Sequence, residues 1–179
     1  MPSAAILYAK RRSEDAAAIA SIGVEVVNLD FVEALWRKLP DPSLWRRILG
    51  LILPEFLHVY PTYKFHVASG KIASADEVMI QAVAARLRGL IDPETIVFCP
   101  LGIGGHIDHV VTRQACEMLG VPLVYWADIP YVVRPHAILS PVDTTRLTAI
   151  QIDDATLLNA KAALCARYPT QYQPVFGTI

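Results

Sequence analysis

The sequence predicts an α/β protein in which helices cover a mainly parallel sheet. Two observations predict this class. Strand-like and helix-like patterns alternate along the chain, which is typical of layered folds with crossover helices. The clearest strand-like run, 95–99, is short, apolar and rich in β-branched residues, and a glycine-rich turn connects it to a helix-like run.

The N-terminal third is expected to begin with a helix over 13–22. Ser13 can cap it, acidic residues follow in its first turn, and Gly23 ends it. Residues 24–29 then have the pattern of a strand, which would place Asp30 at a strand's carboxyl end.

The middle of the chain predicts two helices. The first lies within 42–57 and is interrupted by Pro54, because proline cannot continue a helix. The second, 75–91, is amphipathic, with the inward candidates Val78, Ala82, Ala85 and Leu87.

The remaining elements follow the buried strand at 95–99. The expected elements are a helix at 110–119 ended by Gly120, a strand at 121–126, an irregular segment at 135–143, a strand at 144–150, and a helix at 155–168 ended by Pro169.

Composition and charge limit the partners and the location that we expect for the protein. The 179 residues predict one domain over 1–179, and 54% of them are hydrophobic. A net charge of −1 gives no electrostatic reason to expect nucleic acid or acidic membranes as partners. We expect no transmembrane segment, because no apolar run reaches about 18 residues. Basic residues at 10–12 interrupt any signal peptide, so a cytoplasmic protein is expected.

The segment 100–109 contains the candidate catalytic and metal-binding residues. After the strand at 95–99, a turn containing Gly104 and Gly105 leads to His106, Asp108 and His109. Ligands bind outside the carboxyl ends of strands in open α/β sheets, which is where this turn would lie. Two imidazoles on one helical face beside a carboxylate indicate a metal or acid–base site. The glycines alone are also consistent with a plain tight turn, and Cys99 is an alternative nucleophile.

Gly-Gly-His106-Ile-Asp-His109 resembles the H-x-D-H signature of the LmbE-like (PIG-L) deacetylases. Other stretches resemble the family in order and spacing. They are Arg11-Arg-Ser-Glu14 together with the helix that follows it and ends at Ile22-Gly23, Tyr125-Trp-Ala-Asp-Ile-Pro-Tyr131, and Lys161 through Tyr168-Pro-Thr-Gln171. The resemblance implies a Rossmann-like fold and zinc-dependent removal of acetyl groups from N-acetylglucosamine-type conjugates.

The resemblance also implies roles for single residues. His109 would bind zinc, or Fe(II), which accepts similar ligands. His106 would stabilise the oxyanion or act as general acid, with Asp108 as its partner. Asp128, Tyr131, Gly104 and Gly105 would line the site of a small N-acetylated sugar conjugate.

The chain departs from the family at one point. The family's first signature, H-P-D-D, is absent, and one histidine cannot hold a catalytic zinc. The chain would then be an N-terminally truncated deacetylase, a catalytically inactive sugar-binding or interaction module, or a protein whose missing ligands come from another polypeptide. A missing N-terminal strand would leave a sheet edge uncovered, which favours a homo-oligomer. A metal-free hydrolase using His106 and Asp108 is a further alternative.

Overall fold

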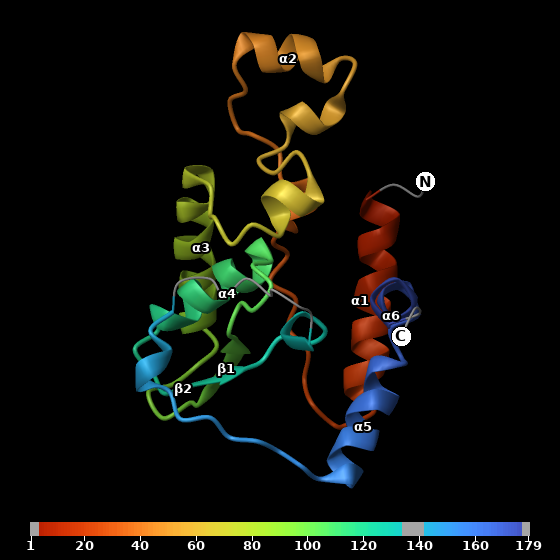
Figure 1. Cartoon of the computed structure of the whole chain (residues 1–179), viewed down its shortest axis with the longest axis vertical. Helices are drawn as coiled ribbons and strands as arrows, with labels where there is room; N and C mark the ends of the chain where they lie inside the picture. The colour runs from red at the N-terminus through yellow and green to blue at the C-terminus, as the bar shows by residue number, and fades with distance from the viewer. Residues whose placement is uncertain (1–3, 134–141, 177–179) are drawn as a thin grey trace. The chain divides into compact units, whose positions relative to one another are not determined.

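The computed structural model describes residues 4–133 and 142–176, which form two compact units. Unit 1 comprises Met1–Asn28 and Asp143–Ile179, and unit 2 comprises Leu29–Val142. The predicted α/β class is confirmed in its coarse form, because the described chain is mostly helical with a small parallel sheet (Figure 1). Most of the predicted irregular segment at 135–143 lies outside the described residues. The expectation of one domain over 1–179 stays a prediction.

The sheet of unit 2 is a single β–α–β unit. Strand β1 (Val97–Pro100) pairs in parallel with β2 (Leu123–Trp126), and α4 (Ile107–Glu117) connects them. The described residues thus form a sheet of two strands, fewer than the prediction implied. The prediction that the first strand is fully buried is wrong for one face, because Cys99 is buried whereas Phe98 is 65% exposed. Alternate side chains of a strand point to opposite faces, and α4 packs against β1.

The core of unit 2 lies between α4 and α3 (Glu77–Arg88). Ile80, Val83 and Ala84 of α3 are buried against the apolar face of α4. The predicted inward face of this helix is therefore wrong at two positions, Val78 and Ala85, which are exposed. Apolar residues occur around most of α3, so their spacing alone fits two different faces.

A lobe formed by residues 39–57 carries α2 (Leu44–Gly50) and the 3-10 helix η2 (Pro54–Leu57). An antiparallel bridge between Lys38 and His58 closes its base. The helix predicted within 42–57 is confirmed in part, and Pro54 begins a new helical turn. The other short helices of unit 2 are η1 (Ala34–Trp36), the π-helical turn η3 (Tyr63–Val67), η4 (Ser74–Asp76) and η5 (Tyr131–Val133).

Unit 1 consists of helices from the two ends of the chain. Its helices are α1 (Ala4–Ala20), η6 (Thr144–Arg146), α5 (Ala155–Cys165) and α6 (Pro169–Phe176). Helix α1 begins nine residues before Ser13, so Ser13 is not a cap. Pro169 begins α6, as proline does at the first position of many helices.

The strands predicted at 24–29 and 144–150 are wrong. Residues 24–33 have no regular structure, and Thr144–Arg146 is the short helix η6. Val24 and Val27 are half-exposed or more. A β-branched run becomes a strand only where a neighbouring strand can pair with it. Within the described chain, no helix is both long and apolar enough to cross a bilayer.

Candidate functional site

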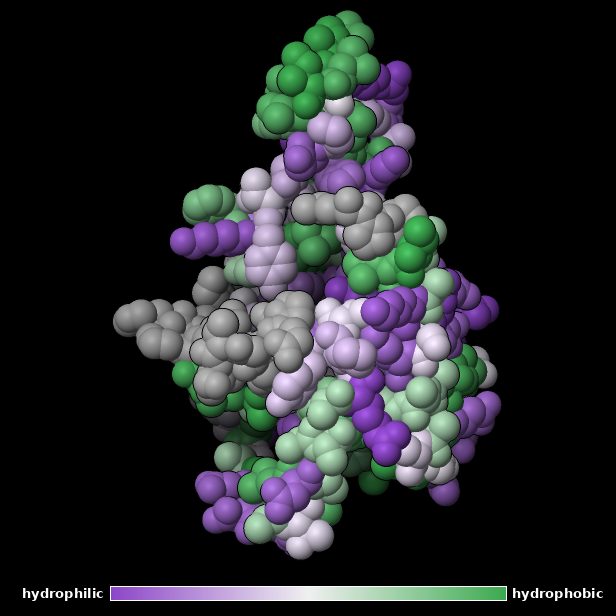
Figure 2. All heavy atoms as spheres, turned by 90° about the vertical axis from the view of Figure 1, so that its right-hand side faces the viewer, coloured by the Kyte–Doolittle hydropathy of each residue, from purple (hydrophilic) through white to green (hydrophobic). Residues whose placement is uncertain are grey.

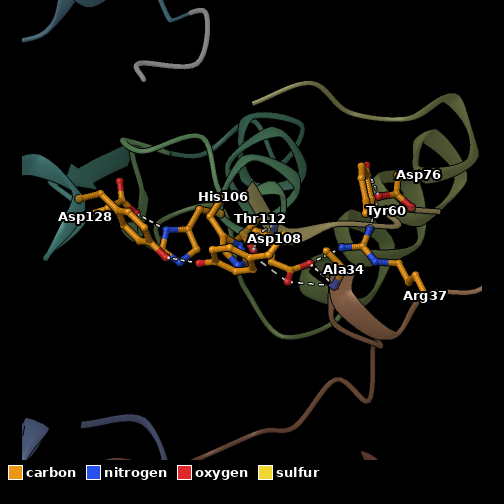
Figure 3. A network of polar contacts seen from close by, with 11 residues as sticks. Ala34, Arg37, Tyr60, Asp76, His106, Asp108, Thr112 and Asp128 are labelled. Atoms are coloured by element: carbon orange, nitrogen blue, oxygen red, sulfur yellow. Dashed lines mark hydrogen bonds and ion pairs between the residues drawn. The ribbon is translucent and has the colours of Figure 1, made fainter. Parts of the chain in front are cut away.

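The site lies where β1 and β2 end. The backbone N–H of Leu101 donates to the carbonyl of Trp126 at 3.0 Å, which holds the two following loops side by side. One loop is the glycine-rich turn that leads into α4, and the other contains Asp128. The structure thus brings His106, Asp108 and Asp128 to one edge of the sheet (Figure 3), and His109 lies there between His106 and Asp128. This is the edge at which the sequence predicted a site.

The Asp128 side chain is fully buried and connects the two loops. Its Oδ2 accepts hydrogen bonds from the backbone N–H groups of Gly102 at 2.8 Å and Ile103 at 2.9 Å. Its Oδ1 lies 2.6 Å from Nδ1 of His109. Because both carboxylate oxygens are used and covered, the structure gives Asp128 a positioning role, rather than the direct contact with a sugar that the resemblance implied.

His109 has one ring nitrogen bound and the other available. An ionised carboxylate can only accept a hydrogen bond, so Nδ1 of His109 donates to Asp128. In the neutral ring, Nε2 then carries a lone pair. The side chain is 35% exposed, so this nitrogen can receive a proton or bind a metal.

His106 has the opposite arrangement. It is the N-cap of α4, and its Nδ1 accepts a hydrogen bond from the backbone N–H of Asp108 at 3.3 Å. The ring proton of neutral His106 therefore lies on Nε2, which makes that nitrogen a donor. Burial lowers the pKa of His106, and the neighbouring His109 and Arg37 lower it further, against the opposing effect of Asp108 and Asp128. These effects favour the neutral ring.

The two imidazoles are thus complementary. Their ring centroids lie 5.2 Å apart, with a donor on His106 and an acceptor on His109. Such a pair can take a proton from one group and give a proton to another during the same reaction.

Asp108 does not orient His106 through its carboxylate. Its Oδ2 lies 3.9 Å from Nδ1 of His106, which is beyond hydrogen-bond reach. The carboxylate instead accepts from the backbone N–H of Ala34, at 3.1 Å to each oxygen, and pairs with Arg37. The side-chain partnership expected for Asp108 and His106 is therefore corrected, because these donors occupy the carboxylate.

Arg37 is buried between two carboxylates, those of Asp108 and Asp76 (Figure 3). Tyr60 completes the group, because its hydroxyl donates to Asp76 at 2.8 Å and its ring lies 5.6 Å from the Arg37 guanidinium carbon. This network attaches the segment around η1 and the start of α3 to the first turn of α4. Sequence reasoning missed Arg37 and Asp76, which match no motif.

Two tyrosines flank the imidazoles. The ring of Tyr63 lies 5.9 Å from that of His106, and the ring of Tyr131 lies 5.8 Å from that of His109. Their hydroxyl oxygens are 3.3 Å apart. Tyr131 was a sequence candidate, whereas Tyr63 was missed.

Gly104 and Gly105 have positive φ angles and close packing. A Cβ on Gly104 would lie 2.5 Å from the Tyr131 side chain, and one on Gly105 would lie 2.8 Å from the backbone nitrogen of Gly70. Both glycines therefore shape the wall of the site. Direct substrate binding by these two residues stays a prediction.

Cys99 is fully buried. A hydrogen bond with Cys116, together with burial, raises the pKa of its thiol far above the ordinary value. The thiolate that a nucleophile requires is disfavoured, which argues against this alternative.

The ligands expected for zinc are incomplete in the described part of the chain. His109 fits one coordination position, with Asp128 behind it as in many metal-binding histidines. No group of three or more histidine, cysteine, aspartate or glutamate side chains is arranged there to hold an ion. The described residues alone do not fit a zinc site.

The chain matches no family model, no curated protein and no solved structure.

Proposed function

We propose that the chain hydrolyses the N-acyl amide of an N-acetylated sugar conjugate at the His106–His109 pair. The observation that carries the proposal is the pair of hydrogen bonds made by the two Nδ1 atoms, from which we infer a donor at Nε2 of His106 beside an acceptor at Nε2 of His109. Amide hydrolysis uses both functions, because the attacking water must lose a proton to an acceptor and the developing oxyanion needs a hydrogen-bond donor.

In this mechanism, Nε2 of His109 takes a proton from the attacking water while the oxygen forms a bond to the carbonyl carbon. The ionised Asp128 stabilises the imidazolium that results. Nε2–H of His106 donates a hydrogen bond to the developing oxyanion. When the C–N bond breaks, the amine nitrogen receives a proton from the His109 imidazolium, and the products are a carboxylic acid and a free amine.

The substrate class and the Rossmann-like topology come from the resemblance to the LmbE-like deacetylases. Two further stretches that resemble the family support this resemblance, because they are hydrogen-bonded to each other in unit 1. Glu14 accepts from the backbone and hydroxyl of Thr170, and Tyr168 donates to Asp15 at 2.9 Å. The cytoplasm is the location that we propose with this activity.

Zinc, with Fe(II) as the alternative metal, would need more ligands than the described residues supply. His109 would supply one ligand, and the others would come from another polypeptide, for example in a homo-oligomer. We assign no catalytic step to a metal.

The incomplete ligand set favours a second candidate, a sugar-binding module without catalysis. Tyr63 and Tyr131 beside the imidazoles would supply aromatic faces for a sugar ring.

Acetate release from an N-acetylglucosamine conjugate tests the proposal. We expect release by the wild type, loss of at least a hundred-fold in kcat for His109→Ala and for His106→Ala, and no change for the control His58→Ala. Loss of activity with a chelator and recovery with added zinc would establish the metal. Unchanged release by both variants would refute the proposal. Saturable binding of the conjugate by the wild type, with no release at any zinc concentration, would establish the binding module.

A further inference from the structure

The 39–57 lobe presents an apolar face to solvent. The large exposed side chains on it are Leu44 (74% exposed), Trp45 (56%), Ile48 (60%), Leu51 (84%), Ile52 (79%) and Leu53 (44%). The green, hydrophobic spheres at the top of Figure 2 belong to this lobe, which carries α2 at the top of Figure 1. Monomeric soluble proteins rarely expose adjacent apolar side chains on this scale, and such patches mark interaction sites.

The face has the spacing of an amphipathic helix that points outward. Leu44, Ile48, Leu51 and Ile52 follow the i, i+4, i+7, i+8 pattern of one helical stripe. In a core helix this stripe would be buried, as it is in α3.

The lobe is held together by contacts beneath and at the edge of this face. A Cβ on Gly50 would lie 2.6 Å from Cγ of Leu57, so the absence of a side chain lets α2 approach η2 closely. Trp45 packs edge-on against Phe56, with ring centroids 6.5 Å apart. Backbone hydrogen bonds of 2.8 Å from Leu39 to Leu57 and from Val59 to Arg37 close the base. The outward apolar face is therefore available without unfolding the lobe.

Basic side chains lie within the lobe and next to it in the sequence. Within the lobe, Arg46 and Arg47 are matched in number by Asp41 and Glu55, and the flanking Lys38 and Lys64 give residues 38–64 a net charge of +2, whereas the whole chain carries −1. Arg46 and Arg47 lie within α2, and the guanidinium carbon of Arg46 is 5.3 Å from the Trp45 ring. The net charge of the whole chain conceals this local excess.

We propose that the 39–57 lobe binds the surface of an anionic lipid membrane. Aromatic and aliphatic side chains beside arginines on a short amphipathic element are typical of helices that lie in the headgroup region. A tryptophan at the edge of the apolar face suits the interface between lipid and water. The basic excess complements anionic headgroups.

A second copy of this chain fits the face less well. In a two-fold contact the same patch meets itself, which brings Arg46 and Arg47 of both copies together. Residues 38–64 of each copy would bring a net charge of +2 to the contact, although Asp41 pairs with Arg47 at 2.9 Å. A membrane surface requires no such self-complementarity.

Co-sedimentation of the full chain with vesicles tests the proposal. We compare phosphatidylcholine vesicles with vesicles that also contain phosphatidylserine. The wild type is expected to bind the anionic vesicles more tightly, and less so at high salt. The double variant Leu51→Glu/Ile52→Glu is expected to bind at least ten-fold more weakly. Arg46→Gln is expected to reduce binding to the anionic vesicles about five-fold, the equivalent of about 1 kcal/mol for one basic side chain at such a surface.

Val78→Glu is the matched control, because Val78 is 76% exposed on α3, outside the lobe. It should bind vesicles as the wild type does. Equal loss in the control, or no binding to either vesicle by the wild type, would overturn the proposal. Self-association without vesicle binding, abolished by Leu51→Glu/Ile52→Glu, would assign the face to a second copy instead. The test does not depend on the proposed activity, which is measured separately by acetate release.

Discussion

Asp128 determines where the ring proton of His109 lies. Asparagine has the same shape but only one acceptor oxygen, and its amide nitrogen can only donate. Asp128→Asn therefore cannot satisfy the N–H groups of Gly102 and Ile103 and also accept from His109. We expect the free energy of unfolding to fall by about 1–3 kcal/mol, and the ring proton of His109 to move to Nε2.

Urea unfolding and ¹⁵N NMR of the imidazole nitrogens measure these two effects. Asp41→Asn is the control, because Asp41 belongs to an exposed ion pair. If Asp128→Asn leaves the His109 tautomer unchanged, the carboxylate does not control the ring.

Arg37 connects the first turn of α4 to the start of α3. Arg37→Met removes the shared partner of Asp76 and Asp108 and leaves the buried Asp76 without its cation. Breaking a buried ion pair from one side costs about 3–5 kcal/mol, and we expect a loss of this size in the free energy of unfolding. Arg47→Met, which breaks an exposed pair, should cost at most about 1 kcal/mol. Equal losses in urea unfolding would contradict the structural role of Arg37.

At the scale of elements, local patterns predicted what local interactions determine. Gly-Gly-His106 after an apolar run predicted the turn and the helix that follows it, because a strand, positive-φ glycines and a helix each depend on neighbouring residues, although α4 begins at Ile107 rather than at the predicted residue 110. Arg37 could not be found in this way. Its partners lie 39 and 71 positions away in the sequence, and no local pattern connects them.

The elements that were predicted wrongly depend on tertiary contacts. The run at 24–29 has the composition of a strand, but the structure gives it no strand to pair with among the described residues. Helix α3 offers two apolar stripes, and the packing of α4 selects the one that contains Ile80 and Ala84. Propensity therefore gives the type of an element more readily than its partner.

The glycine-rich turn gives a direct test at this scale. Gly105 and Gly120 both have positive φ, +66° and +74°, which costs a residue with a side chain about 1–2 kcal/mol. A Cβ on Gly105 would also collide with the backbone of Gly70, at 2.8 Å, whereas nothing lies within 4 Å of one on Gly120. We expect Gly105→Ala to lower the midpoint of thermal unfolding clearly more than Gly120→Ala. Equal shifts would mean that the close approach to Gly70 is unimportant.

At the scale of the whole molecule, unit 1 joins the two ends of the chain. Glu14 and Asp15 of α1 hold Thr170 and Tyr168, which are more than 150 positions away. Burial and the hydrogen bond to Asp15 raise the pKa of Tyr168 from 10.0 to about 12. The folded chain therefore keeps the phenol proton to a higher pH than the unfolded chain does.

This difference fixes the sign of a pH effect. Because the folded pKa lies above the unfolded one, the contribution of Tyr168 to stability is complete below about pH 10 and is lost as the pH rises toward 12. Tyr168→Phe keeps the ring but removes both the titration and the hydrogen bond, so it should be less stable than the wild type at pH 7, and the difference should shrink between pH 10 and 12. Urea unfolding of both proteins across this range measures the effect. A difference that stays constant with pH would show that the Tyr168–Asp15 contact does not stabilise the junction between the two ends of the chain.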